Sequence, residues 1–278
     1  MKYQGSKRRI LKDILPIILK ERKEGQVFVE PFCGSAIISQ NVDAPVIASD
    51  AHYYLVELLR AIQNGWKPPE HVSQDYYYYI RQIYKRLEGG LITYNENVRR
   101  HGEHIDAIIG FVGFCSSYSG KWFGGYARSK NSRGEPRNHA DEQKRNLDKR
   151  APLIQHIEFE CSSYKNLTIP PSSLIYCDPP YAKTTKYKEV GRRRVIQEKS
   201  NIHNTHNAHV IQAPDKKGFS HEDFWTWCRE RRDEGHTIFV SEYEAPDDMV
   251  CVWQKPLISS LTKNTGAKVG MEKLFIVP

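Results

Sequence analysis

The chain has 278 residues, of which 39% are hydrophobic, enough to fill one large α/β domain or a core that carries an inserted subdomain. No stretch approaches the ~18 consecutive apolar residues of a membrane span. The N-terminus also lacks the apolar segment of a signal peptide, so we expect a cytoplasmic protein with no membrane partner. The formal net charge of +8 favours a polyanionic partner such as nucleic acid.

The N-terminal part of the chain alternates between helix and strand patterns. Apolar residues at helical spacing predict a helix over residues 7–15, which Pro16 stops or kinks. The next predicted elements are a strand at 27–29, the start of a helix at 36–38, a strand at 45–48 and a helix over 54–62. This alternation predicts a parallel sheet with right-handed crossovers.

The alternation then breaks at a tyrosine-rich, glycine-punctuated and basic segment. It has helical stretches such as residues 76–87 and no clear strand, so we interpret residues 65–150 as an inserted helical subdomain. The later elements are strands at 157–160 and 174–177, a capped helix over 222–234, and strands at 237–241, 249–253 and 273–277. We therefore expect one sheet domain, formed by residues 1–64 and 151–278, that carries a basic mobile loop over 187–218.

The tetrapeptide Asp178-Pro179-Pro180-Tyr181 directly follows the apolar run 174–177. An apolar run that ends in a rigid Pro-Pro turn predicts a buried strand whose last residues reach the ligand-binding edge of an open α/β sheet. Proline has no N–H group, so the carbonyl oxygens of the turn stay available as acceptors. A carboxylate, carbonyl oxygens and an aromatic ring suit the amino group of a flat heterocycle. The plain alternative is a strand exit with an exposed aspartate.

A second candidate site lies where the first two predicted strands end. Its turn holds Glu30, Phe32 and Gly34, and a glycine lets the backbone pass close to a ligand. An acidic turn repels phosphate but suits a positively charged ligand. Asp50 ends the second strand, where a carboxylate can accept hydrogen bonds from both hydroxyls of a ribose. The alternative role of Asp50 is the N-cap of the following helix.

Four segments stand in an informative order along the chain: residues 2–7, 28–35, 48–50 and 178–181. Together they resemble the Dam-like (D12 class) adenine-specific branch of the DNA amino-methyltransferases. The resemblance implies a class I methyltransferase fold that uses S-adenosyl-L-methionine, an α/β, Rossmann-like fold with a seven-stranded, mostly parallel sheet and one antiparallel strand near the C-terminus. The insertion would then be the target-recognition subdomain of an adenine-N6 methyltransferase of phage or prophage type, acting on a flipped-out base in double-stranded DNA without an obligate protein partner.

Other activities share part of this pattern. A cytosine-N4 DNA methyltransferase could use the same tetrapeptide, and an RNA adenine methyltransferase is a further enzymatic alternative. Outside the enzymes, the alternative is a catalytically inactive DNA-binding relic that kept the fold. The order of the segments, with the cofactor motif first and the insertion before Asp178, favours adenine.

The resemblance also assigns cofactor contacts to single residues. It implies that Tyr3, Lys7, Asp50 and Asp178 touch S-adenosyl-L-methionine, with Tyr3 on the adenosine part and Lys7 paired with the methionine carboxylate. The family often has asparagine two residues after the aspartate that corresponds to Asp50, but this chain has His52.

The predicted catalytic residues are Asp178, Pro179, Pro180 and Tyr181. Hydrogen bonds from the adenine amine to the Asp178 carboxylate and the Pro179 carbonyl would direct the nitrogen lone pair at the methyl group and stabilise the positive charge that develops on nitrogen. Tyr181 would stack on the base, which must leave the duplex to reach such a pocket.

Basic residues near aromatic and glycine residues are the candidate DNA contacts. Lys121, Trp122 and Arg128 follow or lie in an aromatic, glycine-rich stretch, and the alternative is an aromatic core segment. Arg192, Arg193 and Arg194 form a basic run, and the alternative is a solvated face.

No metal site is expected from the sequence. The six cysteines lack Cys-x-x-Cys pairs, which favours reduced thiols over disulfides or zinc ligands. His203, His206 and His209 recur at three-residue spacing within the predicted loop, but a metal site needs converging ligands on a rigid frame.

Overall fold

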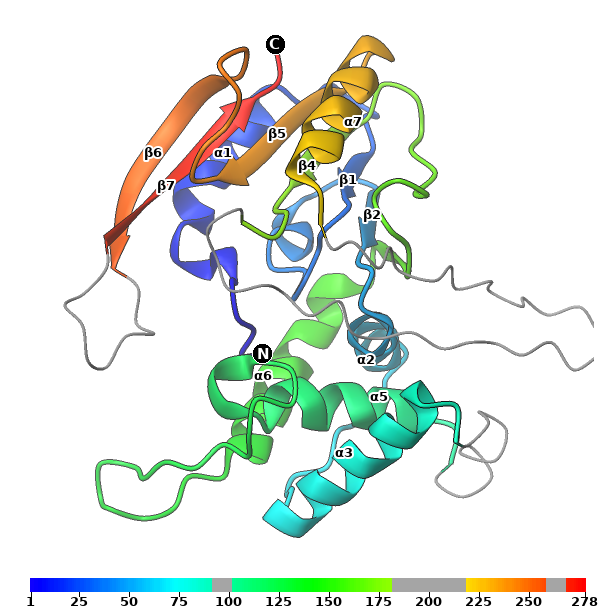
Figure 1. The fold of residues 1–278 in the computed structure, drawn as a ribbon, viewed down its shortest axis with the longest axis vertical. Coiled ribbons are helices and arrows are strands. Elements are labelled where there is room, and N and C mark those ends of the chain that lie inside the picture. The colour runs from blue at the N-terminus through cyan, green and yellow to red at the C-terminus, as the bar shows by residue number, and fades with distance from the viewer. Residues whose placement is uncertain (92–101, 182–218, 259–268) are drawn as a thin grey trace, which may run out of the picture. The chain divides into compact units, whose positions relative to one another are not determined.

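A computed structural model describes residues 1–91, 102–181, 219–258 and 269–278, which form two compact units (Figure 1). The described residues of the first unit are 1–6, 51–91 and 102–155, and the second unit holds the others. Residues 1–6 and 51–64, which the sequence analysis grouped with the sheet domain, thus cluster with the helical segment. The functional division into a catalytic domain and a target-recognition subdomain stays a prediction.

The second unit is built on one seven-stranded sheet with the order β3-β2-β1-β4-β5-β7-β6. The strands are β1 (Phe28–Glu30), β2 (Val46–Ser49), β3 (Ile157–Glu160), β4 (Leu174–Cys177), β5 (Thr237–Glu242), β6 (Val250–Ile258) and β7 (Val269–Ile276). The first five strands pair in parallel, and β7 runs antiparallel to both β5 and β6. The predicted fold class, a mostly parallel seven-stranded sheet with one antiparallel strand near the C-terminus, is confirmed.

Short apolar runs form the buried centre of this sheet. All four residues of β4 and all three of β1 are buried, as expected for parallel strands that are covered on both faces. Helix α7 (His221–Asp233) begins at Ser220, whose hydroxyl accepts a hydrogen bond from the Asp223 N–H at 3.2 Å. Phe224 and Trp227 of this helix belong to one core cluster with residues of β1, β4, β5 and β7.

Helix α1 (Leu11–Lys20) follows a 3-10 turn at Lys7–Arg9 and contains Pro16. The prediction allowed that Pro16 ends this helix, and that alternative is wrong. A proline removes one backbone hydrogen bond, but Ile14 and Ile18 on either side are fully buried, and this burial keeps the helix intact. In Figure 1 the blue helix α1 lies behind the strands and α7 lies in front of them.

The predicted helix start at 36–38 is also wrong, because the chain makes a series of turns there and then a short 3-10 helix, Ser39–Asn41. Gly34 has φ of 48° and Ala36 has φ of 52°, and left-handed backbone at both positions excludes a helix. Glycine adopts this conformation readily, whereas alanine adopts it at a cost in strain.

The described residues of the first unit form helices and turns, with two isolated β-bridges. Its elements are α2 (Tyr53–Gln63), α3 (Gln74–Glu88), α5 (Ile105–Gly110), a π-helical turn (Phe111–Cys115), a 3-10 turn (Tyr118–Gly120), α6 (His139–Arg150) and a further 3-10 turn (Ala151–Ile154). Gly110 allows α5 to approach α2 closely, since a Cβ atom there would lie 2.1 Å from the Tyr54 carbonyl oxygen.

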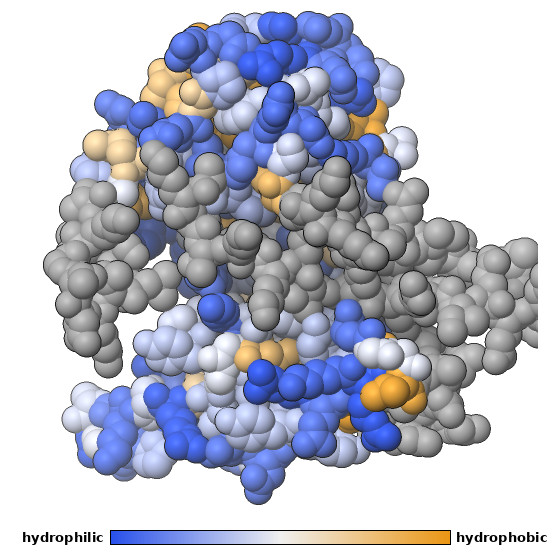
Figure 2. Space-filling view, in the orientation of Figure 1, coloured by the Kyte–Doolittle hydropathy of each residue, from blue (hydrophilic) through white to orange (hydrophobic). Residues whose placement is uncertain are grey.

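The described residues on the face shown in Figure 2 are mostly hydrophilic. No helix among the described residues is long and apolar enough to cross a membrane.

Candidate active site

The segment Asp178–Tyr181 leaves the C-terminal end of β4 in the second unit, at the position predicted from the sequence. The Lys7 Nζ atom lies 2.6 Å from the Asp178 Oδ1 atom and 3.3 Å from the Glu272 Oε1 atom. Lys7 and Glu272 are buried, and the Asp178 side chain is 19% exposed. The structure therefore brings Lys7 and Asp178, two of the predicted site residues, into direct contact.

Burial and charge shift the pKa of both partners. Burial raises the pKa of Asp178 to about 6, although the Lys7 ammonium and its hydrogen bond oppose this shift. Burial alone would lower the pKa of Lys7, but the Asp178 and Glu272 carboxylates outweigh it and raise that pKa above its usual value. Lys7 therefore stays charged, whereas the Asp178 carboxylate takes up a proton in mildly acidic solution.

Tyr181 is held beside this ion pair. Its hydroxyl donates a hydrogen bond to Glu272 Oε1, and the Lys7 Nζ atom lies 4.6 Å from the centre of its ring. Tyr243 packs edge-on against the same ring, with 4.6 Å between the ring centres. Sequence reasoning missed Glu272 and Tyr243. The one available signal for Glu272 was an acidic residue next to the predicted strand at 273–277, which begins four residues earlier, at Val269, in the structure.

The predicted cofactor turn and Asp50 also meet in the second unit. The Gly34 N–H donates to Asp50 Oδ2 at 3.0 Å, and the Cys33 N–H donates to the Ser49 carbonyl at 2.8 Å. The turn after β1 is thereby tied to the end of β2. The alternative role of Asp50 as a helix N-cap is wrong, because the ring of His52 caps α2 by accepting from the Leu55 N–H at 3.3 Å.

Glu30 and Phe32 point into the interior of the second unit. The Glu30 carboxylate accepts hydrogen bonds from the Ser39 hydroxyl and, at 3.1 Å, from the Ser39 N–H. Burial raises the pKa of Glu30 to about 8, so the group is largely neutral at neutral pH and contributes little of the negative charge expected of this turn. The Phe32 ring packs on Tyr164 and Phe224, with 5.3 and 5.7 Å between ring centres. Their roles in cofactor binding stay predictions.

Tyr3 and His52 lie in the first unit. The Tyr3 ring packs on Phe114 at 5.4 Å between ring centres, and His52 packs on the same ring at 4.9 Å. Burial lowers the pKa of His52 to about 3, so its ring is neutral at neutral pH and Nδ1 can accept the capping hydrogen bond. The predicted contact between Tyr3 and the adenosine part is not tested by this arrangement.

Lys121, Trp122 and Arg128 also lie in the first unit. The Trp122 ring stacks on Tyr54 at an interplanar angle of 16° and is in contact range of Gly113, where an added Cβ would lie 2.3 Å from the indole ring. Trp122 is therefore part of an aromatic cluster, whereas Lys121 and Arg128 are exposed. Arg192, Arg193 and Arg194 lie outside the described residues, as do His203, His206 and His209. DNA contact by any of these predicted residues stays a prediction.

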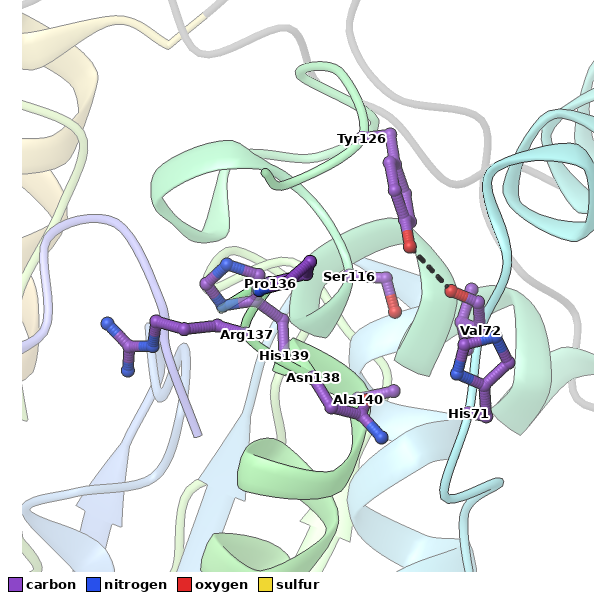
Figure 3. Close-up of a pocket in the computed structure, with 9 residues that line it drawn as sticks. All are labelled: His71, Val72, Ser116, Tyr126, Pro136, Arg137, Asn138, His139 and Ala140. Carbon is purple, nitrogen blue, oxygen red and sulfur yellow. Dashed lines mark hydrogen bonds between the residues drawn. The ribbon is translucent and has the colours of Figure 1, made fainter. Parts of the chain in front are cut away.

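A pocket in the first unit contains none of the predicted site residues (Figure 3). Tyr126 and Val72 both line this pocket, and the Tyr126 hydroxyl donates a hydrogen bond to the Val72 carbonyl at 2.8 Å. Arg137 is paired with Glu142 at 2.6 Å, and Asn138 caps α6. Several polar groups of the pocket thus hold its own walls together. Among the described residues, no cluster of histidine, cysteine, aspartate and glutamate could hold a metal ion.

Comparison with known families agrees with this geometry. Residues 3–209 match the family described as D12 class N6 adenine-specific DNA methyltransferase, a match that covers most of the chain and includes Lys7, Asp50 and Asp178. Enzymes of this family take the methyl group from S-adenosyl-L-methionine. The chain therefore belongs to the D12 class of DNA methyltransferases, and it methylates the N6 amine of adenine in DNA.

Proposed function

We propose that the Asp178 carboxylate and the Pro179 carbonyl accept hydrogen bonds from the N6 amine of the target adenine, with Tyr181 stacked on the base. The observation that carries this proposal is the 2.6 Å contact between the buried Lys7 ammonium and Asp178, which directly follows β4, with the Lys7 ammonium over the Tyr181 ring. The amine is a weak nucleophile because its lone pair is delocalised into the ring. Two acceptors would hold the nitrogen in a more pyramidal form and stabilise the positive charge that develops on it.

The residues of the second unit fit the cofactor that the family uses. Asp50 is an acidic residue at the end of β2, and the left-handed Gly34 lets the backbone of the neighbouring turn come close to a ligand. The ribose hydroxyls would donate to Asp50. When bound, S-adenosyl-L-methionine supplies an already activated methyl group, so the protein mainly positions the reactants. Tyr3, Glu30 and Phe32 are further proposed contacts.

Lys7 can serve the site in two ways at once. An ammonium group has three N–H donors, and the structure directs this ammonium at two carboxylates, Asp178 and Glu272. A third donor would be available for the methionine carboxylate. Lys7 would then link the cofactor to Asp178 while it keeps that carboxylate in place.

A base inside a duplex cannot present its amine to such a group of acceptors, so we propose that the adenine is flipped out of the DNA. Stacking on Tyr181 would offset part of the stacking energy that the base loses. Lys121 and Arg128, which are exposed, are proposed to contact DNA phosphates, and Trp122 is proposed to act near the extruded base.

Substitution of Asp178 tests the proposal. The variant Asp178→Ala should lose methylation of duplex DNA, because no other acceptor replaces the carboxylate. Single-turnover rates with radiolabelled S-adenosyl-L-methionine measure the chemical step, and calorimetry measures cofactor binding separately. The matched control is Asp248→Ala, which removes an exposed aspartate that pairs with Arg229 at 2.7 Å and should leave the rate unchanged. A near wild-type rate for Asp178→Ala would rule out the assigned role.

A further inference from the structure

Glu272 stands out as a buried acidic residue on β7, beyond the part of the chain that matches the family. It is 5% exposed, and burial of a carboxylate is costly unless charged or hydrogen-bonding partners surround it. Its cross-strand partner is Lys255 of β6, but the Lys255 ammonium pairs with Asp13 of α1 at 2.8 Å. Glu272 therefore obtains its partners from the site at the end of β4.

Two donors from distant parts of the sequence converge on one oxygen of Glu272. The Lys7 Nζ atom lies 3.3 Å from Oε1, and the Tyr181 hydroxyl donates to the same atom. Lys7 is also 2.6 Å from Asp178 Oδ1. One carboxylate thus anchors both the ammonium that contacts Asp178 and the ring that lies beneath that ammonium.

This arrangement limits how Tyr181 and Lys7 can move. A tyrosine ring that packs only through its faces can turn and slide, whereas a hydroxyl bonded to a buried carboxylate holds its far end in place. Lys7 shares its charge between two carboxylates, so Glu272 also prevents the ammonium from binding Asp178 alone. With both acids ionised, the three charged groups carry a net negative charge, which suits a positive charge that develops on the amine.

We propose that Glu272 is a positioning residue for methyl transfer. It holds the Tyr181 ring and the Lys7 ammonium in the correct positions relative to Asp178. The inference rests on the proposed roles of Asp178 and Tyr181. It goes beyond them because it assigns the C-terminal strand β7 a part in the reaction through a residue that touches neither the base nor the cofactor.

A double-mutant cycle on the full chain tests this role. Single-turnover methylation of unmethylated duplex DNA is measured for Glu272→Ala, for Tyr181→Phe, which removes only the hydroxyl, and for the double variant. Glu272→Ala should slow the reaction about tenfold or more, since small misplacements of reacting groups have large effects on rate. The double variant should be no slower than Glu272→Ala by more than about twofold, because both changes break the same contact.

Further variants separate positioning from stability. Glu272→Gln keeps an oxygen acceptor for the Tyr181 hydroxyl but loses the charge that pairs with Lys7, so its rate should fall by about threefold or more, yet less than that of Glu272→Ala. It is the informative variant if the alanine variant does not fold. Glu158→Gln is the control, since Glu158 is an exposed strand residue of β3 at the opposite end of the strand order, and its rate should equal the wild-type rate. The cofactor Kd of Glu272→Gln should change by less than about threefold, because Lys7 keeps Asp178 as a partner.

Two results would overturn the inference. One is a Glu272→Gln or Glu272→Ala rate within about twofold of wild type, whatever the melting temperature, and the other is a double variant whose loss equals the product of the two single losses. The Asp178→Ala variant distinguishes this failure from failure of the proposed function. If Asp178→Ala is inactive while the Glu272 variants are fully active, only the role of Glu272 is wrong.

Discussion

In the proposed mechanism, the ionised Asp178 carboxylate accepts a hydrogen bond from the adenine amine and stabilises the positive charge that develops there. Its pKa is raised by burial to about 6, compared with 3.8 for the ordinary side chain. Protonation removes the negative charge and turns one of the two oxygens into an O–H donor, so methyl transfer should decline as the pH falls through about 6. Single-turnover rates between about pH 5 and about pH 8 measure this limb. A decline of the rate centred near pH 3.8, the ordinary pKa of an aspartate, would show that burial does not set the pKa of Asp178 during the reaction.

Asp50 combines a backbone contact with a proposed ligand contact. The variant Asp50→Ala removes both, whereas Asp50→Asn keeps an oxygen that can accept from the Gly34 N–H. We expect Asp50→Ala to weaken binding of S-adenosyl-L-methionine by about 1.5–3 kcal/mol, the range for a charged hydrogen-bonded contact. Asp50→Asn should show a smaller loss, and its melting temperature should stay closer to that of the wild type.

Calorimetric titration of the two Asp50 variants gives the affinities, and thermal unfolding gives the stability. Wild-type affinity in Asp50→Ala together with a lowered melting temperature would mean that Asp50 only ties the turn after β1 to β2. The helix-cap explanation is no longer available for such a result, since His52 caps α2.

At the scale of the elements, the parts that sequence reasoning predicted are the apolar runs. The strands β1, β2, β4 and β5 are short, largely buried and close to the predicted limits, because burial on both faces demands apolar residues. Strand β3, at the edge of the sheet, also matches the predicted limits, but it alternates buried with more exposed residues. The same logic located Asp178, since a polar residue directly after such a run must lie at the end of a strand. The capped helix α7 was predictable from Ser220 and Gly235 for a similar local reason.

Other elements depend on contacts that the sequence does not display. The hairpin of β6 and β7 extends to Ile258 and Val269 through a mixture of polar and apolar residues that includes Pro256 and Gly270. Backbone pairing sustains these strands without a regular apolar pattern. The turn at Gly34 and Ala36 is set by left-handed backbone that overrides a helical pattern. The role of Glu272 could not be predicted either, because its partners Lys7 and Tyr181 are distant in the sequence.

The close approach of α5 to α2 gives a test of the helical unit. Gly110→Ala places a Cβ atom where the Tyr54 carbonyl oxygen would lie 2.1 Å away, so the helices must separate. Overpacking of this kind should destabilise the unit by about 1–3 kcal/mol, measured by chemical unfolding. The comparison variant Gly124→Ala should destabilise the protein less, because the nearest atom to its added Cβ is the Lys121 Cβ at 3.0 Å rather than a backbone oxygen at 2.1 Å. Equal stability of the two variants would contradict the packing described for α2 and α5.

For the whole molecule, the net charge of +8 predicts DNA affinity that weakens with salt. Neutralising Arg192, Arg193 and Arg194 together should weaken binding to unrelated duplexes and reduce the salt slope by roughly one unit for each phosphate that these side chains would otherwise bind. Binding measured over a range of salt concentrations gives that slope.

The control for this triple variant removes the same charge elsewhere. Neutralising three arginines of α7 that form ion pairs within the protein, Arg229, Arg231 and Arg232, lowers the net charge equally. That variant should keep a slope near the wild-type value. Identical slopes for both triple variants would leave residues 192–194 without a role in DNA contact.

We expect this chain to transfer a methyl group to adenine N6 through the site at Asp178. The most direct measurement incubates the purified protein with duplex DNA and S-adenosyl-L-methionine carrying a deuterated methyl group, then digests the DNA and identifies the labelled nucleoside by mass spectrometry. Labelled N6-methyldeoxyadenosine should form with the wild type and be absent with Asp178→Ala. Label in N4-methyldeoxycytidine, or equal amounts of labelled N6-methyldeoxyadenosine with both proteins, would contradict this expectation.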